Sequence, residues 1–182
     1  MINLPYNAVM VDLETMGTEN NASIISIGAV RFWLNVKQDS FTEDQCFYMN
    51  VDLTDCIRNG LTVTGDTIMW WMSQSEEARK AFTTGEPLRL ALENFKMFVP
   101  EKAYVFGNGA TFDNIILRSA FKAVGLDYPV SYKYDACYRT LCKLSDSPFP
   151  KIDGTKHNAL DDAKAQTLHL MQILEEHPWR KK

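Results

Sequence analysis

The chain lacks an excess of basic residues. Lys and Arg number 19 against 23 Asp and Glu, so the formal net charge is −4 at pH 7. A protein of this charge has no global cationic field with which to hold a long polyanion. Any contact with nucleic acid must therefore be local. Bound divalent cations are one way for an acidic protein to attract phosphate, because the charge of the ion reverses the local electrostatics.

Zinc-finger spacing, a secretory signal and a membrane span are also missing. The four cysteines, Cys46, Cys56, Cys137 and Cys142, include no C-x-x-C pair, and no histidine completes a zinc-finger spacing, which favours reduced structural thiols. No basic secretory signal opens the chain, and no apolar run approaches the length of a membrane span. We therefore expect a cytoplasmic protein that makes no contact with a membrane.

The length of the chain and the order of its predicted elements indicate one α/β domain. With 182 residues, 46% of them hydrophobic, the chain can bury one sizeable core, and we expect a single domain over residues 1–182. Apolar runs predict strands at Asn7–Leu13, Ser23–Trp33, Gln45–Val51, Ala103–Phe106 and near Val130–Tyr134. Helical patterns cover Thr67–Phe82, Pro87–Phe98, Asn114–Val124 and about Ala159–Glu175. This order implies a mixed five-stranded sheet flanked by helices.

Two carboxylates share one face of the first predicted strand. Asp12 and Glu14 are spaced i, i+2, so both side chains emerge from the same side of the sheet. Their repulsion must be relieved by protonation, by solvent or by a cation, and hard oxygen ligands favour Mg²⁺ or Mn²⁺. The alternative is that the strand ends in water near Leu13 and leaves two solvated acids.

Asp113, His157 and Asp162 each allow an ordinary and a functional interpretation. Asp113 lies where the loop after the fourth strand enters a helix, which suits an N-cap as well as a site residue. His157 and Asp162 would point about 140° apart on one continuous helix. They can share a site if Asn158 caps the helix and His157 lies on the preceding loop. Otherwise His157 is a surface histidine followed by acids that complement the helix dipole.

Taken together, these residues resemble the pattern of one known family. The order D-x-E, then D, then H-x-x-x-x-D is similar to the DEDDh branch of the DnaQ-like 3′→5′ exonucleases, which have the ribonuclease-H-like fold and include polymerase proofreading domains, RNase T and oligoribonuclease. The likeness runs from Met10 to about Met171. Within the branch, the sequence most resembles the phage and prophage group of exonuclease A-like chains and chains labelled exodeoxyribonuclease VIII. The segments that carry this likeness are VDLETMG, TIMWWMSQSEEAR, FGNGATFDN and HNALDDA.

The resemblance implies an activity and a set of roles. It implies hydrolysis of phosphodiester bonds from the 3′ end of single-stranded DNA or RNA, with release of nucleoside 5′-monophosphates and with two bound Mg²⁺ or Mn²⁺ ions. Asp12, Glu14 and Asp162 would hold one ion. Asp12 would also bridge to the second ion, which Asp113 would support through water. His157 would act as the general base.

Four more residues are candidates for substrate binding. Trp70 and Trp71 are adjacent on a predicted helix, so they cannot both face one cavity. One of them, taken here as Trp70, could stack on a terminal base, and core packing of both is the alternative. Thr15, Met16 and Asn108 flank the acidic residues and are expected to line the nucleotide pocket.

Two other functions fit the same residues. A phosphodiesterase for very short oligonucleotides, similar to oligoribonuclease, is consistent with the absence of basic runs. A catalytically idle nucleic-acid-binding module would keep the fold, but it would not require all of the acidic residues and the histidine of the pattern, which are present here. The sequence does not choose between DNA and RNA, because recognition of the 2′-hydroxyl depends on the geometry of the pocket. It also leaves the oligomeric state open, a homodimer included.

Overall fold

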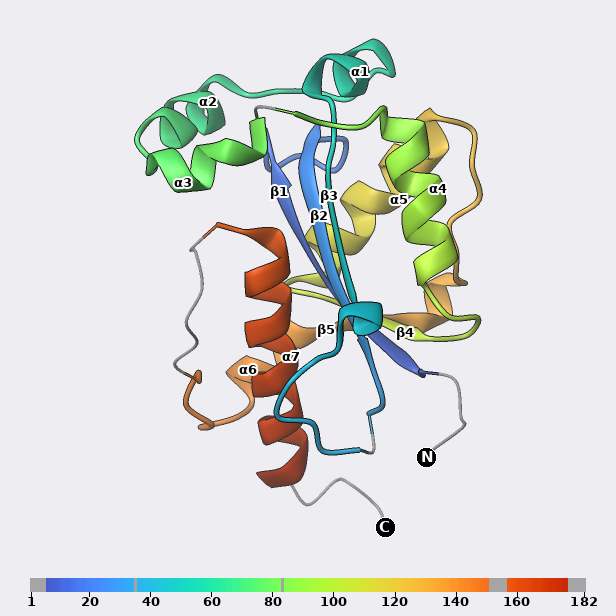
Figure 1. The fold of residues 1–182 in the computed structure, drawn as a ribbon, viewed down its shortest axis with the longest axis vertical. Coiled ribbons are helices and arrows are strands. Elements are labelled where there is room, and N and C mark those ends of the chain that lie inside the picture. Colours follow the sequence, from blue (N-terminus) through green and yellow to red (C-terminus); the bar gives the residue numbers. More distant parts are fainter. Residues whose placement is uncertain (1–5, 35, 83, 151–156, 177–182) are drawn as a thin grey trace.

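A mixed five-stranded sheet forms the centre of the structure, a computed structural model that describes residues 6–34, 36–82, 84–150 and 157–176. The strands are β1 (Ala8–Thr15), β2 (Ile24–Phe32), β3 (Cys46–Asn50), β4 (Tyr104–Gly107) and β5 (Asp135–Cys137). They lie in the order β3-β2-β1-β4-β5 (Figure 1). Strands β1, β2 and β3 form an antiparallel meander, whereas β4 pairs in parallel with β1 and β5. The predicted mixed sheet is confirmed.

Helices lie on both faces of this sheet (Figure 1). They are α1 (Leu53–Arg58), α2 (Gly65–Met72), α3 (Glu76–Arg79), α4 (Leu88–Phe98), α5 (Ile115–Ala123), α6 (Tyr138–Lys143) and α7 (Ala159–Glu176). Helices α4 and α5 pack on one face, and α7 packs on the other with α6 beside it. Within the described ranges, no helix combines the length and the apolar character that a membrane crossing requires.

The alternation of side chains along β1 divides the core into two layers. The odd-numbered residues from Val9 to Leu13 are buried against α4 and α5. The even-numbered residues Ala8 and Met10 are buried on the other face, against α7. Because successive strand residues alternate between faces, Asp12 and Glu14 continue this second row and face the side of α7.

The first turn of helix α7 packs directly on Gly28 of β2. A β-carbon on Gly28 would collide with the backbone of Ala159 and Leu160, so only glycine fits beneath the first turn of the helix. Gly28 is also the register partner of Asp12 on the neighbouring strand. The close contact therefore brings the start of α7 next to the acidic end of β1.

Two predicted elements are wrong in detail. The strand predicted near Val130–Tyr134 is a turn of 3-10 helix at its end, and β5 begins only at Asp135. Val130 precedes this turn and is buried against the core, which explains its apolar character without a strand. The single helix predicted over Thr67–Phe82 is divided, because Ser75 caps a new helix with its side-chain oxygen. Helices α1 and α6 are too short for their periodicity to be recognised.

Candidate active site

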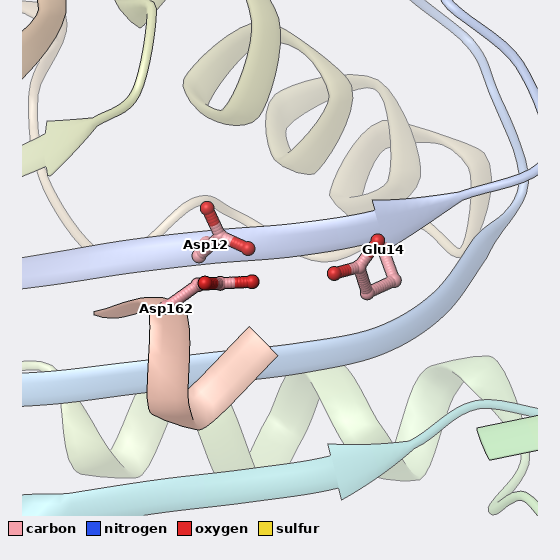
Figure 2. Close-up of side chains that lie close together, drawn as sticks. All are labelled: Asp12, Glu14 and Asp162. Carbon is pink, nitrogen blue, oxygen red and sulfur yellow. The ribbon is translucent and has the colours of Figure 1, made fainter. Parts of the chain in front are cut away.

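Three carboxylates from two elements meet beside the carboxyl end of β1. Asp12 and Glu14 come from β1 and Asp162 comes from the start of α7, and Figure 2 shows the three side chains close together. One oxygen atom of each residue lies within 4.8 Å of the other two. Glu14 is 8% exposed, so the interpretation of two solvated acids at a strand end is wrong.

The three carboxylates repel one another in a poorly solvated environment. Burial, followed by the charges of Asp162 and Asp113, raises the pKa of Glu14 from 4.5 to about 8. Burial also raises the pKa of Asp12 well above its usual range, and the charges of Asp113 and Glu14 add to this effect. The pKa of Asp162 is raised by burial as well, and His157 opposes that shift. A bound cation would favour the ionised form of all three acids.

Gln166 holds one oxygen of Asp12. It lies one turn after Asp162 on α7 and is buried, and its Nε2 donates a hydrogen bond to Oδ1 of Asp12 at 2.7 Å. When Asp12 is ionised, as a bound cation would favour, its carboxylate only accepts hydrogen bonds and so selects the amino end of the amide. Gln166 was not predicted. The one signal in the sequence is its i, i+4 spacing from Asp162, which places both side chains on the same face of a helix.

Asp113 lies in the π-helical turn Ala110–Asn114 that connects β4 to α5. Its Oδ1 accepts the backbone N–H of Leu13 at 3.2 Å, and it caps neither this turn nor α5, so the N-cap interpretation is wrong. Burial raises the pKa of Asp113 to about 7, against the lowering effect of the Leu13 hydrogen bond. The other oxygen, Oδ2, is buried and has no hydrogen-bond partner in the described part of the chain. Asp113 lies outside the close group of three acids.

His157 lies immediately before α7 and is the residue that precedes the N-cap. Oδ1 of Asn158 accepts the N–H groups of the first helical turn at 3.1 and 3.2 Å, so Asn158 is the N-cap and the helix does not continue through His157. His157 and Asp162 consequently line one cavity of about 640 Å³ together with Asp12 and Glu14. The backbone of His157 has a φ of +63°, in the left-handed region that residues other than glycine seldom adopt.

The two tryptophans of α2 have different environments. Trp71 is buried, and its Nε1 donates to the backbone oxygen of Thr15 at 2.9 Å, which ties α2 to the end of β1. Trp70 is 43% exposed and packs edge-to-face against His157, with ring centroids 4.9 Å apart. Core packing of both tryptophans is therefore wrong, and Trp70 is the accessible member of the pair.

The predicted substrate-binding residues are distributed over two cavities that meet at Glu14. A second cavity, of about 720 Å³, is lined by Thr15 and Trp70 together with Glu14. Asn108 lines the first cavity, together with Tyr138 and Arg139 of α6. Met16 lines neither, because it is buried against Ile25 and Trp71 in a small core of its own. The side chain of Met16 thus faces this small core and neither of the two cavities. The pairing register shifts between Glu14 and Thr15, which ends the regular alternation there.

A comparison with protein families agrees with this geometry. The model of a family described as the 3′-5′ exoribonuclease Rv2179c-like domain matches residues 7–174. The chain belongs to this family. The Rv2179c-like match thus supports the predicted 3′→5′ exonuclease class, whereas the closer likeness to phage exonuclease A stays a prediction. No curated protein has significant sequence similarity to the chain.

Solved nuclease structures share the fold of this Rv2179c-like domain. S. pombe Pop2p, in a form with bound Mg²⁺ and Mn²⁺, is similar with a TM-score of 0.66 and 14% identity, over 94% of this chain and 84% of that one. A zinc-bound complex of E. coli ExoI with single-stranded DNA is similar with a TM-score of 0.62 and 17% identity, over 94% of this chain and 41% of that one. These likenesses confirm the predicted ribonuclease-H-like α/β fold.

Proposed function

We propose that this domain is a metal-dependent 3′→5′ exonuclease that releases nucleoside 5′-monophosphates from single-stranded nucleic acid. The observation that carries the proposal is the approach of Asp12, Glu14 and Asp162 to within 4.8 Å of one another from two elements far apart in the sequence. Buried acids that repel one another are costly unless a cation compensates them. Membership of an exoribonuclease domain family supports the 3′→5′ direction and favours RNA as the substrate.

The residues of the site fit a pair of divalent ions. Their donors are carboxylate oxygens, which are the ligands that Mg²⁺ and Mn²⁺ prefer. Asp12, Glu14 and Asp162 would hold one ion. Asp12 would share the second with Asp113, whose Oδ2 is buried and has no hydrogen-bond partner among the described residues. When bound, two ions stabilise the charge of the phosphodiester and of its departing 3′-oxygen. The Mg²⁺ and Mn²⁺ bound to Pop2p support the same choice of metal.

His157 is the proposed general base, which accepts the proton of the attacking water. It shares a cavity with the acids, and the edge-to-face contact between its ring and that of Trp70 orients the imidazole. General-base catalysis contributes about 10²–10⁴-fold, so His157→Ala should slow turnover by that factor. Calorimetry should find the affinity for Mn²⁺ unchanged in this variant. A loss of activity that only follows weaker metal binding would show that His157 is a ligand or a loop residue instead.

Trp70 and Thr15 are proposed to line the site of the terminal nucleotide. Their cavity of about 720 Å³ has the volume of a small-molecule site. The exposed ring of Trp70 offers a surface on which any base can stack, which would give binding without sequence preference. Asn108 lies at the other cavity and is proposed to contact the strand there.

Digestion of end-labelled DNA and RNA of matched sequence tests the proposed function. We expect hydrolysis with Mg²⁺ or Mn²⁺, none in excess EDTA, and none by Asp12→Asn, which weakens both metal sites. Complete hydrolysis in EDTA would contradict the metal requirement. Substrates graded from dinucleotides to long strands separate a general exonuclease from an oligonucleotide phosphodiesterase. Binding without cleavage at any metal concentration would indicate an idle binding module.

A further inference from the structure

Arg139 lies in the same cavity as the acidic cluster but comes from a different part of the fold. It belongs to the first turn of α6, whereas the acids belong to β1 and α7. The cavity of about 640 Å³ extends from the carboxylates to Arg139 and Asn108. Arg139 is the only Arg or Lys among the described residues that line it. One permanent positive charge therefore lies in a cavity that is otherwise acidic or neutral.

Two neighbours contact the Arg139 side chain, which is exposed to solvent. Its Nε donates a hydrogen bond to Oδ1 of Asn108 at 3.3 Å. The guanidinium also lies beside the backbone of Gly109, since a β-carbon on that glycine would be 3.8 Å from Cζ of Arg139. Gly109 has a φ of +121°, which favours glycine there and keeps the space beside the guanidinium open. Only Nε makes this contact, and neither terminal amino group of Arg139 donates a hydrogen bond to another described residue.

Arg139 forms no ion pair with a carboxylate among the described residues, although its charge lowers the pKa of Asp113. In the described part of the chain, the ion pairs involve other basic residues. Arg118 provides a contrast, because its Nε and a terminal amino group bind both oxygens of Asp135 at 3.0 and 2.9 Å. A planar guanidinium with free amino groups matches two oxygens of a phosphate group.

We propose that Arg139, positioned by Asn108, forms a subsite for the phosphate next to the one that is cleaved. This inference rests on the proposed function. The scissile phosphate belongs beside the carboxylates, so the group that meets Arg139 across the cavity is the neighbouring phosphate of the same strand. Because the protein has a net charge of −4, a local cation such as Arg139 would attract the phosphate backbone in place of an extended basic surface. Arg139 consequently distinguishes an oligonucleotide from a substrate with a single phosphodiester.

The test compares a single-stranded oligonucleotide with thymidine 5′-(p-nitrophenyl phosphate), which carries one phosphodiester only. Arg139→Ala should raise KM for the oligonucleotide roughly tenfold with kcat nearly unchanged, since a charge-assisted hydrogen bond is lost from binding. The KM for the small ester should stay the same. Arg139→Lys keeps the charge without the planar fork and should restore part of the loss. Arg89→Ala on α4, which removes the same charge from the opposite face of the sheet, is the matched control.

The salt dependence of binding provides a readout that a purely structural role would not change. For the oligonucleotide, the slope of log affinity against log salt should fall by about 0.7 in Arg139→Ala, the value of one phosphate contact on a single strand. Binding can be followed by fluorescence anisotropy in Ca²⁺, so this measurement does not require hydrolysis. Absence of hydrolysis in the wild type would contradict the proposed function alone. An unchanged salt slope, or an equal rise of KM for the small ester, would overturn the subsite.

Discussion

Replacement of Glu14 by glutamine should stabilise the metal-free protein at alkaline pH. The pKa of Glu14 is raised from 4.5 to about 8, by burial first and then by Asp162 and Asp113. Between these two pH values the folded state keeps a proton that the unfolded state has lost. The free energy of unfolding therefore decreases as the pH rises from about 4.5 to about 8, and the contribution of Glu14 is fully present only below that range.

The size of this effect follows from the shift. At ~1.4 kcal/mol per pKa unit, ionised Glu14 costs the folded state up to ~5 kcal/mol. The charges of Asp162 and Asp113 contribute to the shift of Glu14, and Glu14 in turn acts on Asp12, so the cost is shared among these acids and is not all recovered when Glu14 is neutralised. We expect Glu14→Gln to gain ~2–4 kcal/mol at pH 9, or ~5–15 °C in Tm, and to gain little at pH 5.

Thermal unfolding in EDTA between pH 5 and pH 9 measures this difference. Glu93→Gln is the control, because Glu93 is a partly exposed residue of α4, in an ion pair with Arg89 and remote from the acidic cluster. Addition of Mg²⁺ should make the wild type more stable than Glu14→Gln at pH 9, because the ion binds the ionised carboxylate that only the wild type has. The reasoning is refuted if the difference in Tm between Glu14→Gln and the wild type does not change with pH. It is also refuted if the variant is less stable than the wild type at pH 9 in EDTA.

Two further substitutions test the supports of the site. Gln166→Met should weaken Mn²⁺ binding by about 10–100-fold in calorimetry while the fold is retained, because it removes the hydrogen bond that orients Asp12. Gln172→Met, which changes a partly exposed glutamine of the same helix whose amide bonds to Glu176, should have no such effect. Gly28→Ala should lower the free energy of unfolding by ~3 kcal/mol or more, since the new β-carbon meets the backbone of α7. Gly65→Ala, where the β-carbon meets no atom within 4 Å, should be tolerated, and equal stability losses would contradict the close contact.

The elements predicted most accurately are those in which the pattern of apolar side chains indicates the buried face. Strand β1 and helix α7 each present a continuous apolar row, and the period of a strand is enough to put Asp12 and Glu14 on one face. Strand β5 was misplaced because three residues with half-buried side chains carry no such pattern. Its position depends on backbone pairing with β4, which the side chains do not encode.

The supporting residues of the site were beyond the reach of the sequence for a different reason. Gln166 and Arg139 are polar residues on helices, where most polar residues simply face solvent. Their importance depends on how α6 and α7 approach β1, and this arises from the tertiary packing around Gly28 and Asn108. The N-cap at Asn158 remained an open alternative, because the same residues also allow a continuous helix through His157.

The most direct test of the proposed exonuclease follows which end of a strand is shortened. Two single strands of the same sequence, one blocked at its 3′ hydroxyl and one blocked at its 5′ end, are incubated with the protein in Mg²⁺ and sampled over time. We expect the 5′-blocked strand to lose one nucleotide at a time, with nucleoside 5′-monophosphate as the product, while the 3′-blocked strand resists. Shortening of the 3′-blocked strand from its free 5′ end, or an endonucleolytic ladder from either strand, would contradict the 3′→5′ exonuclease.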